Sequence, residues 1–231
     1  MANVVAKAVM GVLEKMFSCA EVVAVRKWKP GTMVEIELHI PGVDMGDWKS
    51  IKRLKTKVGE CEYRDYTPAD WDAERSVCTM YIETGHEGTG SNWGNNVKRG
   101  DEVLYGPAHA TVLPSKPGRI LGLGDGSALG HFLALKKLTG RQDYPIDVTV
   151  FLADDYVLPK KLVSDNTEFE FITNAGGNAF KALAASAARR DLGLYTSIYI
   201  AGNSGMVRDL KKMLRYRDEV TARFYGAEFW K

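Results

Sequence analysis

Hydrophobic and polar residues alternate through the first half of the chain, in short segments separated by turn residues. A period of two places successive side chains on opposite faces of a strand, which is typical of a half-buried sheet. Turns rich in glycine and proline at 30–31, 41–42 and 85–90 end several of these segments. We therefore predict an antiparallel β-barrel of six strands. The predicted strands are residues 20–28, 33–40, 51–58, 60–67, 76–83 and 102–106.

The pattern changes at residues 114–118, a connector rich in proline and glycine. Beyond it, apolar strands alternate with segments of helical periodicity, which predicts a doubly wound parallel sheet with helices on both faces. The predicted strands are 119–124, 146–153, 168–173, 195–202 and 219–226, and the predicted helices are 127–138, 178–190 and 204–215. We expect a barrel domain at 20–113 and an α/β domain at 119–231.

The segment before the barrel, residues 1–19, has a different pattern. Its apolar side chains recur at three- and four-residue spacing over 2–17, which predicts an amphipathic helix. Charged residues interrupt the apolar run, so it is too short and too polar to cross a bilayer, and it lacks the features of a signal peptide. We expect it to pack on the body of the protein; a peripheral membrane contact or a dimer contact is the alternative.

The composition narrows the possible partners and the compartment. A net charge of +2 over 231 residues gives no reason to expect a nucleic acid. The three cysteines, Cys19, Cys61 and Cys78, have no metal-like spacing, and their odd number argues against a disulfide framework. A reducing cytoplasm is therefore expected, with no metal site and no integral membrane segment. Both a monomer and a homodimer are compatible with the sequence.

The end of the fourth predicted strand carries the first candidate chemistry. Its residues are Arg64, Asp65, Tyr66 and Thr67. Arg64 and Tyr66 lie on one face of the strand by alternation, and the following proline ends it. A cation, an aromatic ring and a hydroxyl at one strand end suit a flat, phosphorylated ligand. An edge strand in which Arg64 pairs with a nearby aspartate explains the same pattern without a ligand.

Three loops rich in glycine are candidate phosphate sites. In 84–96, Ser91 and Asn92 are suited to open a helical turn whose free amides would bind an anion. The loops 122–130 and 200–207 each join a strand to a helix in the second half. Ligands of open α/β sheets bind at such carboxyl ends of strands. Chain reversal and close strand-to-helix packing are the alternatives without a ligand.

Taken in order, these segments resemble the siderophore-interacting proteins, a branch of the ferredoxin-reductase-like flavoproteins. Residues 64–67 are similar to the R-x-Y-T flavin motif of that family. Its other motifs resemble His86, Gly88, Gly90, Ser91 and Trp93; Gly100, Asp101, Gly106 and Pro107; Asp125 to Gly130; Ala201 to Asn203; and Phe229 to Lys231. The resemblance extends from about residue 20 to the end of the chain.

The resemblance implies a barrel that binds FAD. Tyr66 would lie against the isoalloxazine ring, Thr67 would bond near its N5 edge, and Arg64 would pair with the pyrophosphate. Tyr66 and Thr67 are therefore the expected catalytic residues. Trp230 would either cover a flavin face or pack the tail down. The expected cofactor-binding residues are Arg64, Asp65, Tyr66, Thr67, His86, Gly88, Gly90, Ser91, Asn92, Trp93, Gly124, Asp125, Gly126, Ser127, Gly202, Asn203 and Trp230.

The activity implied by the resemblance is reduction of a ferric siderophore, with FAD passing electrons from NADH or NADPH. Iron leaves because oxygen donors hold ferrous ion less tightly than ferric ion. Gly126, Ser127 and Asn203 depart from the family's glutamate, threonine and second glutamate, so we expect the nicotinamide side of the site to differ from that of the family. Two alternatives stay open: a flavoprotein reductase for another acceptor, such as a ferredoxin, an oxygenase or free flavin, and a flavin- or siderophore-binding protein without efficient turnover.

Three basic residues of the last predicted helix, Lys211, Lys212 and Arg215, are candidates for binding an anionic siderophore. A solvated helix face, which is the favoured interpretation, explains them without a ligand. Asp154 and Asp155 follow a predicted strand of the α/β domain, where an acidic residue favours NADH by receiving a ribose hydroxyl. A solvated loop is again the alternative.

Overall fold

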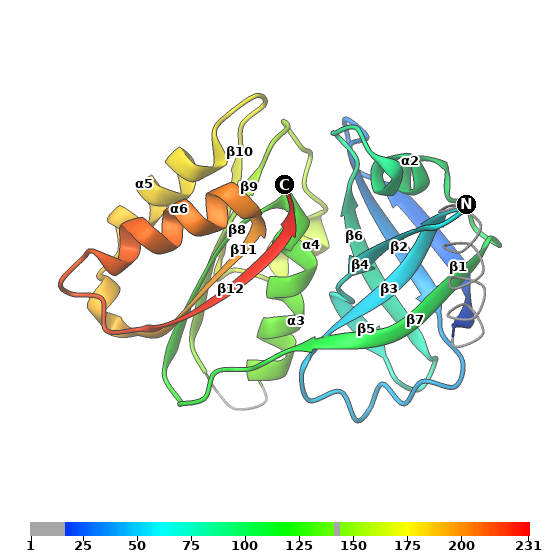
Figure 1. Cartoon of the computed structure of the whole chain (residues 1–231), viewed down its shortest axis with the longest axis horizontal. Helices are drawn as coiled ribbons and strands as arrows, with labels where there is room; N and C mark the ends of the chain where they lie inside the picture. The colour runs from blue at the N-terminus through cyan, green and yellow to red at the C-terminus, as the bar shows by residue number, and fades with distance from the viewer. Residues whose placement is uncertain (1–16, 141–143) are drawn as a thin grey trace, which may run out of the picture.

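The computed structural model describes residues 17–140 and 144–231. These residues form two halves that lie side by side, one built on an antiparallel sheet and one on a parallel sheet (Figure 1). The predicted fold class, an antiparallel barrel followed by a doubly wound α/β fold, is confirmed. The helix expected over 2–17 lies almost wholly outside the described residues, and Ser18 and Cys19 already belong to the first strand.

The antiparallel half is a curled seven-stranded sheet with the order β4-β3-β7-β1-β2-β6-β5. Six of its strands overlap the predicted strands, and the short β5 is an addition. Alternation buries one face: Val34, Ile36 and Leu38 are fully buried, and the residues between them are not. The strands are β1 (Ser18–Lys27), β2 (Met33–His39), β3 (Ile51–Gly59), β4 (Glu62–Tyr66), β5 (Asp70–Asp72), β6 (Val77–Glu83) and β7 (Glu102–Thr111), with helix α2 (Thr89–Asn96) between β6 and β7.

The parallel half is a five-stranded sheet with the order β10-β9-β8-β11-β12. Helices α5 and α6 cover one face, and α3 lies on the other face, against the barrel (Figure 1). The strands are β8 (Arg119–Asp125), β9 (Ile146–Leu152), β10 (Phe169–Thr173), β11 (Tyr195–Asn203) and β12 (Arg223–Trp230). The helices are α3 (Leu129–Gly140), α4 (Lys160–Ser164), α5 (Ala179–Ala188) and α6 (Ser204–Arg215), with short 3₁₀ turns η1 (Gly126–Ala128) and η2 (Leu192–Leu194).

The strand order of the parallel sheet changes direction between β8 and β11. The connections from these two strands therefore leave toward opposite faces, which opens a crevice at their carboxyl ends. The two glycine-bearing loops of this half, after β8 and after β11, meet at that crevice.

The last strand begins four residues later than the pattern predicts, because β12 covers Arg223–Trp230 and not 219–226. Pairing with β11 sets this position: Arg223 lies opposite Ser197, and Trp230 lies opposite Asn203. The residues between the end of α6 and Arg223 form the connection from that helix to the edge of the sheet. The shift brings Trp230 to the carboxyl end of β11, beside the crevice.

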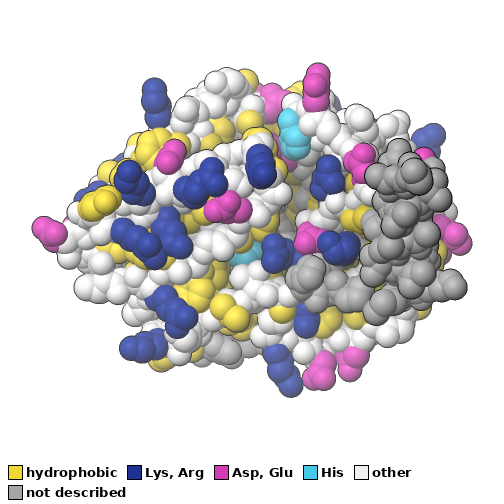
Figure 2. All heavy atoms as spheres, in the orientation of Figure 1, with side chains coloured by type: hydrophobic (Ala, Val, Ile, Leu, Met, Phe, Trp, Pro, Cys, Tyr) yellow, Lys and Arg dark blue, Asp and Glu magenta, His cyan; other side chains and the backbone are white. Residues whose placement is uncertain are grey.

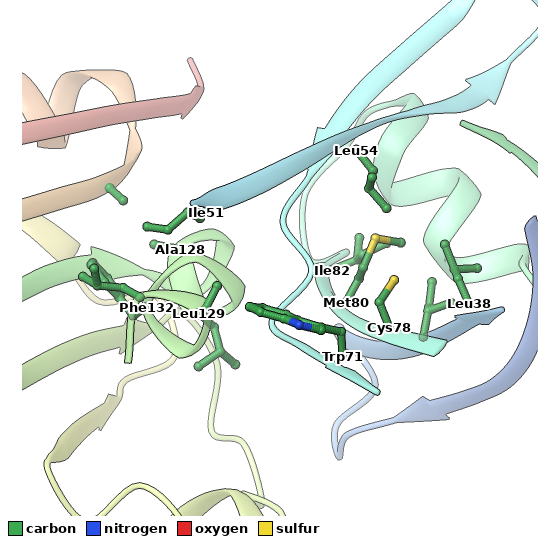
Figure 3. Close-up of a cluster of buried hydrophobic side chains, with 14 of the residues drawn as sticks. Leu38, Ile51, Leu54, Trp71, Cys78, Met80, Ile82, Ala128, Leu129 and Phe132 are labelled. Carbon is green, nitrogen blue, oxygen red and sulfur yellow. The ribbon is translucent and has the colours of Figure 1, made fainter. Parts of the chain in front are cut away.

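One hydrophobic core runs from the barrel into the α/β half. Figure 3 shows Trp71 extending from the barrel residues Cys78 and Met80 toward Leu129 and Phe132 of α3. Because side chains from both halves share this core, the two halves pack directly against each other. The seam between them is therefore a fixed part of the structure.

Polar contacts add to the apolar seam. Lys137 of α3 forms an ion pair with Asp70, and its ammonium group lies 4.5 Å from the centre of the Trp71 ring. The Thr32 hydroxyl lies 2.8 Å from Asp154 Oδ2 and 2.8 Å from the Tyr156 hydroxyl. No helix within the described residues is both long and apolar enough to cross a membrane.

Candidate functional site

A cavity of about 410 Å³ opens at the seam between the two halves. Figure 2 shows the surface hollowed between them on the face that Figure 1 presents. The barrel contributes the end of β4, the end of β6 and the start of α2, and the α/β half contributes η1, the start of α3 and the end of β12. The lining residues from the predicted set are Arg64, Asp65, Tyr66, Thr67, His86, Gly88, Gly90, Ser91, Ser127 and Trp230.

Residues at the end of β4 form one wall of the cavity. Arg64 and Tyr66 lie on one face of the strand, as alternation requires, and both approach Gly90 of α2. The Arg64 guanidinium donates to the Tyr63 carbonyl at 2.8 Å and lies 3.8 Å from Glu62, with about half of its side chain exposed. Glu62, and not an aspartate of the following loop, is thus its acidic neighbour. The guanidinium is held at the rim by one carbonyl and a distant carboxylate.

The first turn of α2 forms the second wall and offers unpaired donors. Gly88 precedes the helix with a φ of 146°, and no side chain caps the first turn. The Ser91 hydroxyl is buried and has no hydrogen-bond partner among the described residues. The Asn92 amide differs from the expectation, because it already donates to the Gly88 carbonyl at 2.9 Å and Asn92 does not line the cavity.

The walls formed by β4 and α2 meet at Gly90. A Cβ atom at this position would lie 2.8 Å from the Tyr66 hydroxyl and 3.3 Å from Cγ of Arg64. Only a glycine lets the helix backbone come this close to the strand. Trp93, one turn further along α2, stacks on the Tyr66 ring with centres 5.6 Å apart and planes at 21°. Trp93 therefore supports Tyr66 from behind and does not itself line the cavity.

Aromatic rings also close the cavity from the α/β side. The Trp230 indole stacks on the His86 imidazole, with centres 5.3 Å apart and planes at 7°. Its Nε1 lies 3.3 Å from Asp125 Oδ2, and 37% of the residue is exposed. Trp230 is thus held over the cavity by one ring of the barrel and one carboxylate of the α/β half.

Asp125 ties together the two strand ends at the crevice. One carboxylate oxygen accepts from the Ser127 amide and hydroxyl, and the other accepts from the Asn203 amide at 2.7 Å and from Trp230. Burial raises the pKa of Asp125, and these donors oppose the rise. Gly202 has a φ of 127°, and a Cβ atom there would overlap the Asp125 carboxylate.

The other predicted residues of this half have structural partners. Gly124 packs beneath Phe132 and Ala128, and the Asn203 side chain caps α6 by accepting from the Met206 amide. Neither residue lines the cavity, and nor do Asp125, Gly126 or Gly202. Of the nicotinamide-side set, Ser127 and Trp230 alone reach the cavity lining.

The basic residues proposed to bind substrate, Lys211, Lys212 and Arg215, do not line the cavity. Lys211 extends over β12 near Gly226, and the Arg215 guanidinium lies 5.5 Å from the centre of the Phe224 ring. They belong to the exposed side of α6, where Figure 2 shows a concentration of basic side chains. Asp154 accepts a hydrogen bond from Thr32 across the seam. It therefore helps to join the two halves, a role that the sequence did not indicate.

The sequence reasoning missed the acidic residue at the end of β6. Glu83 lines the cavity, and its carboxyl group lies against Gly126, where a Cβ atom would be 3.0 Å from Oε1. Burial, and then the negative charges of Asp125 and Asp154, raise the pKa of Glu83 to about 8. Alternation along β6 contained a signal, because it places Glu83 on the same face as Tyr81, which also lines the cavity.

Comparison with known proteins shows the fold of the chain. No family model matches it, and no curated protein matches it in sequence. A siderophore utilization protein from T. fusca is similar, with a TM-score of 0.71, 18% identity and coverage of 93% of this chain and 92% of that chain. The siderophore-interacting protein from Acinetobacter baumannii has a TM-score of 0.67 at 15% identity, covering 92% of this chain and 89% of its own.

A ferredoxin NADP+ reductase from Neisseria gonorrhoeae, solved with bound FAD and NADP, is also similar. Its TM-score is 0.68 at 17% identity, with coverage of 93% of this chain and 99% of that chain. Siderophore-interacting proteins are thus among the structural neighbours, as the sequence motifs suggested. The chain has the ferredoxin-reductase-like fold.

Proposed function

We propose that the chain is an FAD-dependent oxidoreductase that draws electrons from NADH or NADPH. The observation that carries this proposal is the cavity at the seam. There an arginine, a tyrosine and a threonine from one strand end face the uncapped first turn of a helix, and an aromatic ring from the other half closes the space. The neighbours with the same fold include a reductase described with bound FAD and NADP.

The residues at the cavity fit the two parts of FAD. The unpartnered Ser91 hydroxyl and the first amides of α2 are donors suited to a pyrophosphate, and the half-exposed Arg64 guanidinium offers a planar fork for its oxygens. The absence of a Cβ atom at Gly90 lets the helix amides approach that position. A cavity of about 410 Å³ is within the usual range for small-molecule sites, about 300–1,000 Å³.

The ring system of the cofactor would lie between Tyr66 and Trp230. Tyr66 is held in place by stacking on Trp93, and burial raises the pKa of its phenol, which keeps the ring neutral. When bound, FAD would supply the redox chemistry that links a two-electron hydride donor to a one-electron acceptor. The chain's own contribution would be to bind, orient and shield that ring, with Thr67 as the expected partner at its edge and Trp230, stacked on His86, as its cover from the α/β side.

As the acceptor we propose a ferric siderophore. The support is the resemblance of the motifs, together with the structural likeness to a siderophore utilization protein and a siderophore-interacting protein. A ferric siderophore is often anionic, and the basic side of α6 with Lys211, Lys212 and Arg215 would attract it over a distance without lining the cavity. We propose that the protein acts in the cytoplasm, where NADH and NADPH are available.

The first test is the visible spectrum of the purified protein, before and after addition of NADH or NADPH without oxygen. We expect about one FAD per chain, with a yellow colour that bleaches with at least one donor. A protein that is colourless and takes up no added FAD contradicts the proposal. Colour that persists with both donors assigns the chain to the flavin-binding proteins without turnover.

The acceptor is tested on the reduced protein. Reoxidation rates are compared among a ferric hydroxamate, a ferredoxin and free flavin, with release of ferrous iron followed by a chelator. We expect the ferric hydroxamate to be reduced fastest. Faster reduction of ferredoxin or free flavin supports the alternative, a reductase for another acceptor.

A further inference from the structure

Glu83 occupies an unusual position for a carboxylate. It ends β6 on the face that it shares with Tyr81, and it lines the cavity at the point where the barrel meets η1. Its carboxyl group faces the position that a Cβ atom of Gly126 would take, because both oxygens and the carboxyl carbon lie 3.0–3.1 Å from that position. The missing side chain at 126 thus makes room for a carboxyl group from the other half of the molecule.

The surroundings of Glu83 do not favour its charged form. Within residues 17–140 and 144–231, its carboxyl group has no hydrogen bond or ion pair. The groups whose charge acts on it are Asp125 at the end of β8 and Asp154 after β9, and it acts in turn on the Tyr156 hydroxyl. Asp125 accepts from four donors and Asp154 accepts from Thr32, and all of these donors are neutral groups that leave the negative charge of the two carboxylates in place.

Other charged or titratable groups share the cavity but do not pair with Glu83. They come from β3, β4, the loop after β6, and the end of the chain: Arg53, Lys55, Arg64, Asp65, His86, Glu87, Glu228 and Lys231. Lys55 pairs with Asp65 at 3.2 Å, and Arg64 is engaged by Tyr63 and Glu62. Among the lysines and arginines that line the cavity, Arg53, Lys55 and Arg64 thus lie on β3 and β4, where the phosphates of a ligand would lie, and Lys231 lies at the end of the chain.

We infer that the Glu83 carboxyl group stands in the cavity in its protonated form and donates a hydrogen bond to the planar ligand bound there. A neutral carboxylic acid is a donor, whereas a carboxylate only accepts. The acceptor is a carbonyl oxygen or a ring nitrogen of a heteroaromatic ring, which belongs to the flavin if the proposed function is correct. The raised pKa of Glu83 agrees with this geometry. The inference rests on the proposed function only for the identity of the ring.

The first experiment tests whether the Glu83 carboxyl group is protonated in the ligand-free protein. Infrared difference spectra of the ligand-free protein are recorded between pH 6.5 and 9.5 for the wild type, Glu83→Gln and Glu21→Gln. Gln keeps the shape and a donor but cannot titrate, and Glu21 is an exposed strand residue of the same sheet. We expect the carbonyl band of a protonated carboxyl group to disappear near pH 8 in the wild type and in Glu21→Gln, and to be absent in Glu83→Gln.

The second experiment tests the hydrogen bond to the ligand. The Kd of FAD is measured over the same pH range by quenching of flavin fluorescence. Above pH 8, we expect the wild-type Kd to rise about tenfold per pH unit because the donor is lost. The Kd of Glu83→Gln is expected to stay constant, and that of Glu21→Gln to follow the wild type.

The outcomes separate this inference from the proposed function. FAD binding with the same pH profile in wild type and Glu83→Gln overturns the inference and leaves the flavin proposal intact. Absence of a titrating carboxyl band that depends on Glu83 also overturns it. A band that depends on Glu83, in a protein that takes up no FAD, supports the protonated carboxyl group and refutes the flavin as its partner.

Discussion

At the scale of single residues, the cavity consists of side chains that the fold leaves incompletely paired. Among the described residues, the Ser91 hydroxyl has no partner, Arg64 is held by the Tyr63 carbonyl and a more distant Glu62 carboxylate, and Glu83 faces two carboxylates. A buried polar group without a partner costs about 1–3 kcal/mol, so such groups are uncommon in a folded chain. Ser91 places one such group at the cavity, beside aromatic rings, and this unpartnered hydroxyl is the strongest residue-scale argument for a bound ligand.

Arg64→Ala tests the assignment of the phosphate side. The guanidinium is about half exposed, so we expect the fold and its unfolding temperature to be retained. The Kd of FAD should rise about 10- to 100-fold, because a charge-assisted hydrogen bond contributes about 1.5–3 kcal/mol. Binding is measured by fluorescence titration, with Arg75→Ala, an exposed turn residue, as control. An Arg64→Ala protein that keeps stoichiometric FAD at wild-type affinity refutes this role.

At the scale of elements, function depends on where strands and helices end. The first turn of α2, the end of β4 and the end of β6 form the barrel side of the cavity, and η1 and the end of β12 form the other side. At the cavity, Gly90 and Gly130 are two positions where one element approaches another closely, because a Cβ atom would lie 2.8 Å from the Tyr66 hydroxyl at Gly90 and 2.8 Å from the Thr67 carbonyl oxygen at Gly130. The N-terminus of α2 carries a partial positive charge, so its backbone attracts anions in addition to any attraction from side chains.

Ser91→Ala distinguishes a ligand-binding hydroxyl from a structural one. Because the hydroxyl has no partner in the ligand-free protein, its removal should leave the free energy of unfolding unchanged or raise it. The stabilisation produced by added FAD should decrease, with a Kd about tenfold higher. Thermal unfolding with and without FAD measures both effects.

Ser186→Ala is the matched control for Ser91→Ala, because this fully buried serine bonds to Thr149 and to Glu170. It should lose stability and keep the full response to FAD. A Ser91→Ala protein that behaves like Ser186→Ala would show that Ser91 has a packing role alone.

At the scale of the whole molecule, one core and several polar contacts join the barrel to the α/β half. His131 of α3 lies within this shared core at 1% exposure, in contact with the rings of Phe132, Tyr199 and Phe229. Burial, and then the charge of Arg53, lower the pKa of His131 to about 3. The folded protein therefore keeps this imidazole neutral where the unfolded chain would protonate it.

The stability of the molecule should consequently fall in acid. Between pH 6.5 and pH 3 the unfolded chain binds a proton at His131 that the folded protein does not, so the stabilisation is complete above pH 6.5 and decreases below it. The slope from this group is up to about 1.4 kcal/mol per pH unit. Urea unfolding of His131→Leu at pH 7.5 and pH 5 should show a smaller decrease than the wild type. Equal decreases in both proteins contradict this account.

The sequence alone determined the order and type of most elements. These elements show local patterns. Residues 34–38 alternate because one face of their strand is buried, and β8 and β11 are continuous apolar runs because both of their faces are buried. The sequence also determined the candidate residues Arg64, Tyr66, Gly90 and Ser91, which lie close together in the chain or in adjacent loops. Local periodicity could not determine the start of β12, because the pairing of Arg223 with Ser197 depends on a distant strand.

Only the tertiary structure decided which of these residues meet. It brought Trp230 onto His86, placed the Glu83 carboxyl group against Gly126, and engaged Asp125 with Asn203. It also left Lys211 and its basic neighbours outside the cavity. These outcomes depend on contacts between residues that are far apart in the chain, and on the burial that raises the pKa of Glu83. A linear pattern records which face of its own element a side chain takes, but not what packs against that face.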